Sequence, residues 1–349
     1  MDQVRLGRTG IVTNRNGFGA LPVQRVPMEE AVRLLRMALD GGMTYFDTAR
    51  SYTDSEEKLG RAFEGRRNQL FLATKTPSVT VEGFWRDLET SLRLLRTDCI
   101  DVYQFHNPSF CPRPGDGTGL YEAMLEARAQ GKIRFIGITN HSAAIAAEAI
   151  ASGLYDTLQY PFSYLAADRD IRLVEDCAKA DMGFVAMKSL SGGLITNAAA
   201  AYAFAAQFPG ALPIWGIQRE KELREFLSFM DAPPRMTEEM RALIEHDREE
   251  LSGDFCRGCG YCMPCPAGIE INNCARISLL VRRSPTAYWL GEEGQAKMAK
   301  IRDCLNCGRC RSRCPYHLDT PALLRKNLAD YENIIAGRVE VRADNEVRA

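Results

Sequence analysis

The sequence lacks any long hydrophobic run. Its most apolar stretch, residues 198–206, is far too short to span a bilayer. The first residues contain no apolar segment of the kind that marks a secretory signal. The formal net charge of -1 leaves no basic excess for a nucleic-acid or anionic membrane surface. We therefore expect a cytoplasmic protein without nucleic-acid or membrane partners.

Cysteine is scarce in the first 250 residues and dense after them. Only Cys99, Cys111 and Cys177 precede that point, whereas the other nine of the twelve lie between Cys256 and Cys314. Such a change of composition marks a domain boundary. In a cytoplasmic chain, clustered cysteines indicate metal binding more often than disulfides. Cys99 and Cys177 stand in periodic apolar contexts, so we expect them to pack in a core.

Short apolar runs alternate with helical patterns from residue 27 to residue 228. Alternation of strands and helices predicts an α/β fold with a parallel sheet, and eight such units in this length favour a closed (β/α)8 TIM barrel. The expected strands cover residues 17–20, 44–46, 70–74, 100–105, 133–138, 157–159, 184–187 and 211–214. The expected helices include residues 28–40, 80–96, 120–130, 142–151 and 170–180, and an alanine-rich one within 196–208.

Four segments follow from these patterns. The barrel is expected in residues 1–235, and it begins with a hairpin over residues 4–13 that closes the bottom of the barrel. Residues 236–253 read as a connecting amphipathic helix, with Thr237 as its N-cap. The cysteine-rich domain covers residues 254–336. Residues 337–349 are charged and aperiodic, and we expect them to be frayed.

The cysteines fall into two runs. The second run has the C-x2-C-x2-C-x3-C-P spacing of bacterial ferredoxins, and the first run has one residue fewer before its last cysteine. Zinc sites also use C-x2-C motifs, but they combine two pairs and not two triads that each lead to Cys-Pro. The eight thiolates therefore predict two [4Fe-4S] clusters. The runs are Cys256, Cys259, Cys262 and Cys265, and Cys304, Cys307, Cys310 and Cys314.

The analogy with ferredoxins also predicts how the ligands divide. The first triad would share its cluster with Cys314, and the second triad would share its cluster with Cys265. The short spacing before Cys265 leaves Cys274 as an alternative ligand. Helical patterns at residues 273–283 and 292–302 separate the runs, so we expect an α-helical ferredoxin-like domain.

Three titratable residues stand at or just past the ends of expected strands. They are Asp47, Lys75 and His106, and Tyr52 follows five residues after Asp47. The carboxyl ends of barrel strands are where catalytic side chains converge. Each residue alone is more often a surface or core residue, but four at matching positions indicate an active site.

The motifs around these four residues resemble those of the aldo-keto reductases, over roughly residues 3–228. The cysteine runs are similar to those of the branch of this family that carries a C-terminal ferredoxin-like domain. The resemblance implies carbonyl reduction or alcohol oxidation with NAD(H) or NADP(H), on a small carbonyl or alcohol substrate. It implies Tyr52 as the acid or base, Lys75 to lower its pKa, Asp47 to hold Lys75, and His106 to orient the carbonyl. The motifs are Phe46-Asp47-Thr48-Ala49-x-x-Tyr52, Ala73-Thr74-Lys75 and Tyr103-Gln104-Phe105-His106.

The same resemblance implies residues for the nicotinamide. The end of the strand at Thr139 and Asn140 is similar to the family's nicotinamide-binding strand end. Asn140 and Gln159 would bind the carboxamide group. Met187 stands where many members have an aromatic side chain that stacks on the ring.

The resemblance also implies residues for the rest of the dinucleotide. Lys188 and Leu190 would lie near the pyrophosphate, and Arg219 near the adenosine end. Glu222 aligns where NADPH-preferring members place an arginine for the 2′-phosphate, and a carboxylate would repel that group. Arg219 or Lys221 would compensate, so the sequence favours NAD(H) and leaves NADP(H) open.

A second function is consistent with the same motifs. Hydride transfer moves two electrons, whereas a [4Fe-4S] cluster moves one, and no flavin-binding signature is visible. The alternative is a redox-sensing or accessory electron-transfer subunit whose clusters are structural or serve a redox partner protein. The intact Asp47, Tyr52, Lys75 and His106 favour the enzyme.

Overall fold

The computed structural model describes residues 2–251, 255–283 and 287–341. The chain divides into two compact units, each described here by itself. One comprises Met1–Ser189 and Ala198–Arg241, and the other comprises Leu190–Asn197 and Ala242–Ala349. The short segment Leu190–Asn197 therefore groups with the C-terminal residues, which the sequence did not suggest. The end of the expected frayed tail, residues 342–349, lies outside the described residues.

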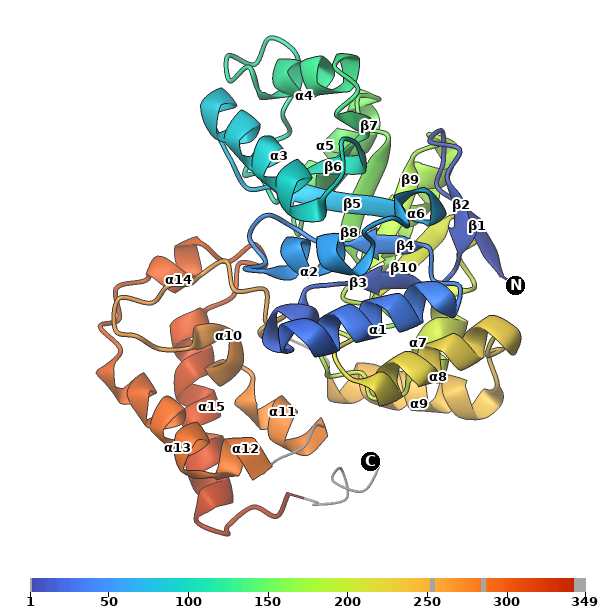
Figure 1. Cartoon of the computed structure of the whole chain (residues 1–349). Coiled ribbons are helices and arrows are strands. Elements are labelled where there is room, and N and C mark those ends of the chain that lie inside the picture. The colour runs from blue at the N-terminus through green and yellow to red at the C-terminus, as the bar shows by residue number, and fades with distance from the viewer. Residues whose placement is uncertain (1, 252–254, 284–286, 342–349) are drawn as a thin grey trace. The chain divides into compact units, whose positions relative to one another are not determined.

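Eight parallel strands close into a barrel, which confirms the predicted TIM-barrel fold (Figure 1). Each strand pairs with the next along the chain, and β10 pairs with β3 to complete the circle. All eight expected strands are present, with ends shifted by one or two residues. They are β3 (Gly17–Gly19), β4 (Tyr45–Asp47), β5 (Phe71–Thr76), β6 (Ile100–His106), β7 (Ile133–Thr139), β8 (Thr157–Pro161), β9 (Gly183–Met187) and β10 (Ala211–Gly216).

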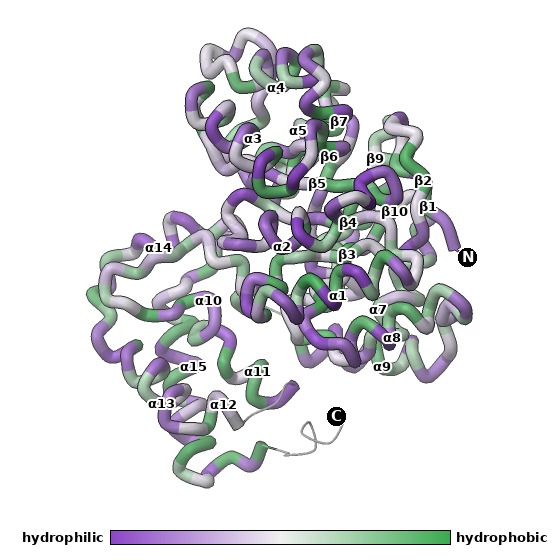
Figure 2. The backbone as a smooth tube through the Cα atoms, viewed as in Figure 1, coloured by the Kyte–Doolittle hydropathy of each residue, from purple (hydrophilic) through white to green (hydrophobic). Residues whose placement is uncertain are grey.

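Amphipathic helices follow the strands of the barrel. In α1 the buried residues Ala31, Leu34, Leu35 and Ala38 recur at helical spacing and form one apolar face, and Figure 2 shows the resulting alternation of colour. The helix α3 begins where the Thr80 hydroxyl accepts an N–H, as expected of an N-cap. The helices are α1 (Met28–Asp40), α2 (Ser55–Ala62), α3 (Val81–Leu95), α4 (Leu120–Ala129), α5 (Ala143–Ser152), α6 (Asp168–Lys179), α7 (Ala198–Ala205) and α8 (Glu220–Asp231).

The predicted N-terminal hairpin is also confirmed. Strands β1 (Gln3–Arg5) and β2 (Val12–Asn14) pair antiparallel. Val4, Leu6 and Ile11 are almost completely buried, and they share one core cluster with inward side chains of β4, β5, β6, β9 and β10. The hairpin turn bonds to the chain just before β9, because the Arg8 N–H donates to the Asp181 carbonyl at 2.6 Å. The hairpin thus closes the amino end of the barrel and leaves the carboxyl end for chemistry.

The C-terminal unit is helical in its described residues. The long helix α15 contacts α10, α11, α13 and α14. Buried Asn327 ties it to its neighbours: its amide donates to the Ala275 carbonyl at 3.1 Å and accepts from the Ser278 N–H at 3.0 Å. None of the described helices is long and apolar enough to cross a membrane. The elements are α10 (Ile271–Cys274), α11 (Ile277–Arg283), α12 (Ala287–Leu290), α13 (Glu292–Ala299), η3 (Lys300–Asp303), α14 (Arg309–Ser312) and α15 (Thr320–Ile335).

Helix α9 (Glu238–Glu250) occupies most of the expected connecting segment. The Thr237 hydroxyl accepts the Met240 N–H at 3.2 Å, so Thr237 has the capping role that its position predicts. Residues 252–254, which end that segment and begin the expected cysteine-rich domain, lie outside the described residues.

Candidate functional site

A buried ion pair stands at the carboxyl end of β4 and β5. The ammonium of Lys75 lies 2.6 Å from the Asp47 carboxylate and donates to the Thr48 carbonyl at 2.6 Å. Burial lowers the pKa of Lys75 and raises that of Asp47, and the attraction between the two charges opposes both shifts. Removing one partner of such a pair costs about 3–5 kcal/mol, because the other charge is left buried and alone. Each residue therefore depends on the other.

Two glutamines complete the surroundings of Asp47. The Gln104 amide donates to the Asp47 carboxylate at 3.4 Å and to the Gln159 side-chain oxygen at 2.9 Å. The Gln159 amide donates to the other carboxylate oxygen at 3.3 Å. The structure thus places Gln159, expected at the nicotinamide, against the ion pair. Gln104 was missed as a site residue, although it lies two residues before His106 on β6 and so shares its side of the strand.

Tyr52 and His106 meet beside Lys75. Their rings lie edge to face with centroids 5.7 Å apart, and the Lys75 ammonium is 5.4 Å from the Tyr52 ring centre. Burial and then the charge of Lys75 lower the pKa of His106 to about 3, so its imidazole is neutral near pH 7. The structure therefore brings the four sequence-predicted catalytic residues together at one end of the barrel.

Ser51 adds a contact to this group. Its hydroxyl lies 3.2 Å from Nδ1 of His106. In a neutral imidazole one ring nitrogen carries the proton and the other accepts. If the Ser51 hydroxyl donates to Nδ1, Nε2 carries the proton and is the nitrogen that donates.

The residues expected to bind the nicotinamide lie on or directly after three adjacent strands: Thr139 and Met187 end β7 and β9, Asn140 follows β7, and Gln159 lies in the middle of β8. Thr139 ends β7 and pairs with Gln159 of β8, and the Thr139 hydroxyl donates to the sulfur of Met187 of β9 at 3.8 Å. The Asn140 amide donates to the Pro108 carbonyl at 2.8 Å, and its oxygen also accepts a backbone N–H. Asn140 therefore fixes the loop that follows β7.

The residues expected near the phosphates follow β9 and precede α8. Lys188 adopts a left-handed backbone conformation, with φ of 56°. Leu190 begins the segment that groups with the C-terminal unit. Arg219 precedes α8 and pairs with Glu222, since its Nη2 lies 2.6 Å from that carboxylate. Glu222 also accepts the N–H groups of Gln218 and Arg219, at 3.0 and 3.1 Å, and so caps the helix.

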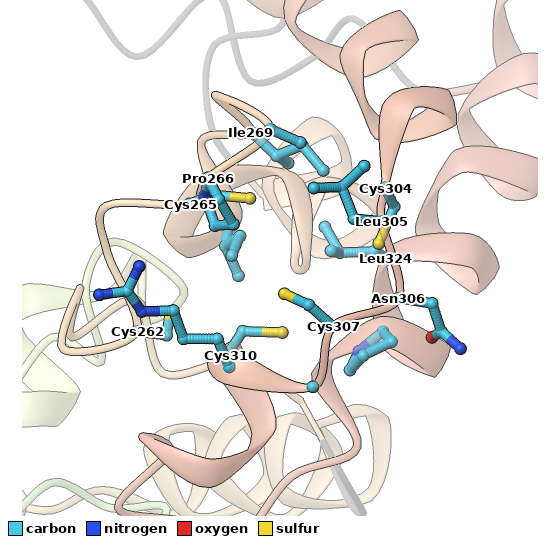
Figure 3. Close-up of a pocket in the computed structure, with 15 residues that line it drawn as sticks. Cys262, Cys265, Pro266, Ile269, Cys304, Leu305, Asn306, Cys307, Cys310 and Leu324 are labelled. Atoms are coloured by element: carbon cyan, nitrogen blue, oxygen red, sulfur yellow. The ribbon is translucent and has the colours of Figure 1, made fainter.

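Five cysteines line a cavity with about 380 Å³ of empty space in the C-terminal unit. They are Cys262 and Cys265 from the first run and Cys304, Cys307 and Cys310 from the second. Their sulfur atoms point toward the space between them, and apolar side chains such as Ile269, Leu305 and Leu324 complete the walls (Figure 3).

A second cavity, with about 320 Å³ of empty space, is lined by Cys256, Cys259, Cys262 and Cys314. The structure thus brings Cys314 to the first triad and Cys265 to the second. Cys262 lines both cavities, so the two cavities are neighbours.

The donor sets of the two cavities fit [4Fe-4S] clusters. Each set consists of four thiols around an open space, as four corners of a cubane require. In a zinc site, by contrast, four ligands converge on one point about 2.0–2.3 Å away.

The remaining cysteines line neither cavity. Cys274, the alternative ligand, is buried in α10, and its thiol faces the Lys297 carbonyl at 3.8 Å. Cys177 is fully buried in α6, and Cys111 is buried with its thiol 3.8 Å from the Tyr155 hydroxyl. Cys99 is partly exposed next to β6.

Family models match both parts of the chain. Residues 13–200 match the aldo/keto reductase family, and residues 255–319 match the 4Fe-4S dicluster domain. Among curated proteins, an aldo-keto reductase of Bacillus subtilis, YhdN, is 30% identical over 216 residues, which cover 56% of this chain and 64% of the relative. The methylglyoxal reductase DkgB of Salmonella typhimurium is 34% identical over 167 residues, which cover 45% of this chain and 60% of the relative. The chain thus spans less than two thirds of the length of these relatives.

Solved structures share the barrel. The aldo-keto reductase AKR11C1 from Bacillus halodurans superposes with a TM-score of 0.63 at 21% identity, over 71% of this chain and 96% of that one. The thermostable aldo-keto reductase Tm1743 superposes with a TM-score of 0.59 at 27% identity, over 71% of this chain and 100% of that one. An aldo-keto reductase from Klebsiella pneumoniae, solved with NADPH, gives a TM-score of 0.60 at 23% identity, over 70% of this chain and 94% of that one. The chain belongs to the aldo/keto reductase family and carries a 4Fe-4S dicluster domain after its barrel.

Proposed function

We propose that the protein is a nicotinamide-dependent oxidoreductase that interconverts small carbonyl compounds and alcohols. The observation that carries this proposal is the buried Lys75–Asp47 pair with Tyr52 and His106 beside it. The dinucleotide, when bound, would supply or accept the hydride. The protein side chains would then supply or accept the accompanying proton, so that carbonyl, hydride and proton together give the alcohol.

Tyr52 is the group that moves this proton. Phenol is a weak acid, with an ordinary pKa of about 10, and a nearby ammonium stabilises its phenolate. Lys75 provides that charge, and Asp47 with its two glutamines keeps the charge in place. In reduction Tyr52 donates its proton to the developing alkoxide, and in oxidation it removes the proton of the alcohol.

His106 orients the substrate. Because burial keeps its imidazole neutral, it donates a hydrogen bond to the carbonyl oxygen without competing for the proton. Because His106 is uncharged, Lys75 is the one cation among these four residues, and its charge acts on Tyr52.

Three neighbouring strands would hold the dinucleotide. Thr139, Asn140 and Met187 support the nicotinamide side, since they lie at or just after the carboxyl ends of β7 and β9. Gln159 lies beside Thr139 on β8. Lys188 and Leu190 follow toward the pyrophosphate, and Arg219 toward the adenosine end, in separate turns of the chain.

The pairing at the start of α8 favours NAD(H) over NADP(H). Glu222 already neutralises Arg219 and accepts the N–H groups that a 2′-phosphate would seek. A phosphate there would have to displace a carboxylate of like charge.

The two cysteine sets would each hold one [4Fe-4S] cluster. When bound, the clusters would carry single electrons to or from a redox partner protein or the active site. Cys256, Cys259, Cys262 and Cys314 would hold one cluster, and Cys265, Cys304, Cys307 and Cys310 the other. The support is that each set of four thiols lines one of two neighbouring cavities, and Cys262 lines both.

Replacement of Tyr52 by phenylalanine tests the catalytic assignment. The variant lacks the proton that the alkoxide needs, so turnover should fall by a factor on the order of 10²–10⁴. Reduction of a panel of aldehydes and ketones by NADH and NADPH measures this. Tyr288→Phe, at an exposed position in the C-terminal unit, is the matched control and should keep its activity. Unchanged turnover in Tyr52→Phe would refute the assignment, and no turnover by the unmodified protein would favour the accessory-subunit function.

Replacement of Glu222 by glutamine tests the cofactor preference. Loss of one negative charge near a bound 2′-phosphate is worth about 1 kcal/mol in water, or about fivefold in selectivity. We expect the ratio of kcat/KM for NADPH to that for NADH to rise by about this factor. The exposed Glu225 on the same helix provides the control variant Glu225→Gln, in which the ratio should not change. An unchanged ratio in Glu222→Gln would exclude a role for this carboxylate in selectivity.

Two cysteine variants test the ligand division. Cys265→Ala removes a corner ligand of one cavity, so anaerobically purified protein should lose about half of its iron and acid-labile sulfide. Cys274→Ala should keep the full content, because Cys274 lines neither cavity. Iron and sulfide analysis, with the visible absorbance of the clusters, gives the answer. Loss of iron in Cys274→Ala, with full iron content in Cys265→Ala, would make Cys274 the ligand in place of Cys265.

A further inference from the structure

A buried arginine in the C-terminal unit lies between two glycines. The guanidinium of Arg276 donates to the Gly192 carbonyl at 3.0 Å, and its Nε donates to the Asn272 carbonyl at 3.0 Å. A Cβ on Gly192 would stand 2.8 Å from Arg276 Nη1, and a Cβ on Gly258 would stand 2.6 Å from its Cζ. Both glycines have positive φ, 66° and 62°. The guanidinium therefore occupies a slot that leaves no room for a side chain on either side.

The two glycines belong to segments with different proposed roles, one in cluster binding and the other next to the dinucleotide. Gly258 lies between Cys256 and Cys259 of one cavity, and its N–H donates to the Cys256 sulfur at 3.4 Å. Gly192 belongs to the loop Leu190–Asn197, which follows Lys188 after one residue, Ser189. Lys188 and Leu190 are the residues that we propose for the pyrophosphate.

A second arginine holds the same loop. The Arg283 guanidinium donates to the Leu194 carbonyl at 3.0 Å, and it is held in turn by the carboxylates of Asp247, at 2.9 Å, and Glu250. The loop Leu190–Asn197 is thus fixed through its backbone by two side chains of the C-terminal unit. This explains why it groups with that unit and not with the barrel.

We infer that Arg276 is a positioning residue that makes dinucleotide affinity depend on the cluster held by Cys256, Cys259, Cys262 and Cys314. The inference rests on the proposed function. A rigid, planar guanidinium transmits a shift of the Cys256–Cys259 turn to the Gly192 carbonyl, since it fills the space between them. Cluster binding fixes that turn, and the turn fixes the loop. By thermodynamic linkage, dinucleotide binding must then raise the affinity of the protein for the cluster by the same factor.

Four alanine variants at glycines test this coupling. Gly258→Ala and Gly192→Ala push a methyl group into the guanidinium. Gly260→Ala and Gly193→Ala are matched controls: both glycines also have positive φ and lie in the same two segments, but a Cβ would meet no atom within 4 Å. The affinity for NADH, measured by fluorescence on anaerobic, cluster-loaded protein, should weaken about tenfold in the first pair relative to its controls.

Retention of iron supplies a reading that does not depend on activity. NADH should slow the loss of iron to a chelator in the unmodified protein and in both controls, but not in Gly192→Ala, whose cysteine turns are unaltered. If Gly258→Ala takes up no cluster, the comparison of Gly192→Ala with Gly193→Ala decides alone. Equal NADH affinity and equal protection in these two variants would overturn the inference while leaving the proposed function intact. Absence of NADH and NADPH binding to the unmodified protein would overturn the proposed function, and the inference with it.

Discussion

The ion pair between Lys75 and Asp47 is the interaction on which the barrel chemistry depends. Two charges removed from water cannot be separated cheaply, so each holds the other at the end of its strand. Gln104 and Gln159 bind the same carboxylate, and the Lys75 charge helps to keep His106 neutral. The closed barrel makes this arrangement rigid, because adjacent parallel strands fix the positions of all these groups.

The C-terminal unit has a different requirement: its chain must place four thiols around each of two cavities. The chain does this by exchanging the last cysteine of each run, so that neither cavity can be completed without the other run. Helix α15 contributes Pro321 and Leu324 to the lining of one cavity, and its buried Asn327 bonds to the Ala275 carbonyl. The exchange thus ties each cavity to both cysteine runs.

Much of this architecture could be predicted from the sequence, because its signals are local. Alternating apolar runs predicted every barrel strand, and three of the four residues that meet at the carboxyl end lie at or next to the ends of the successive strands β4, β5 and β6. The sequence did not single out α2, since buried Glu56 and Lys58 interrupt its apolar pattern. Gln104, the contacts of Arg276 with Gly192 and the grouping of Leu190–Asn197 with the C-terminal unit all depend on packing between distant segments, which no local pattern records.

The proposed function depends on hydride transfer between the nicotinamide and the carbonyl carbon, with the proton supplied by Tyr52. The most direct measurement uses nicotinamide deuterated at C4 on the transferred face, with any carbonyl compound that the protein reduces, under anaerobic conditions. The account predicts deuterium on the carbinol carbon of the product alcohol. Hydrogen from solvent at that carbon, with deuterated nicotinamide consumed, would contradict it and would assign the reduction to single-electron steps.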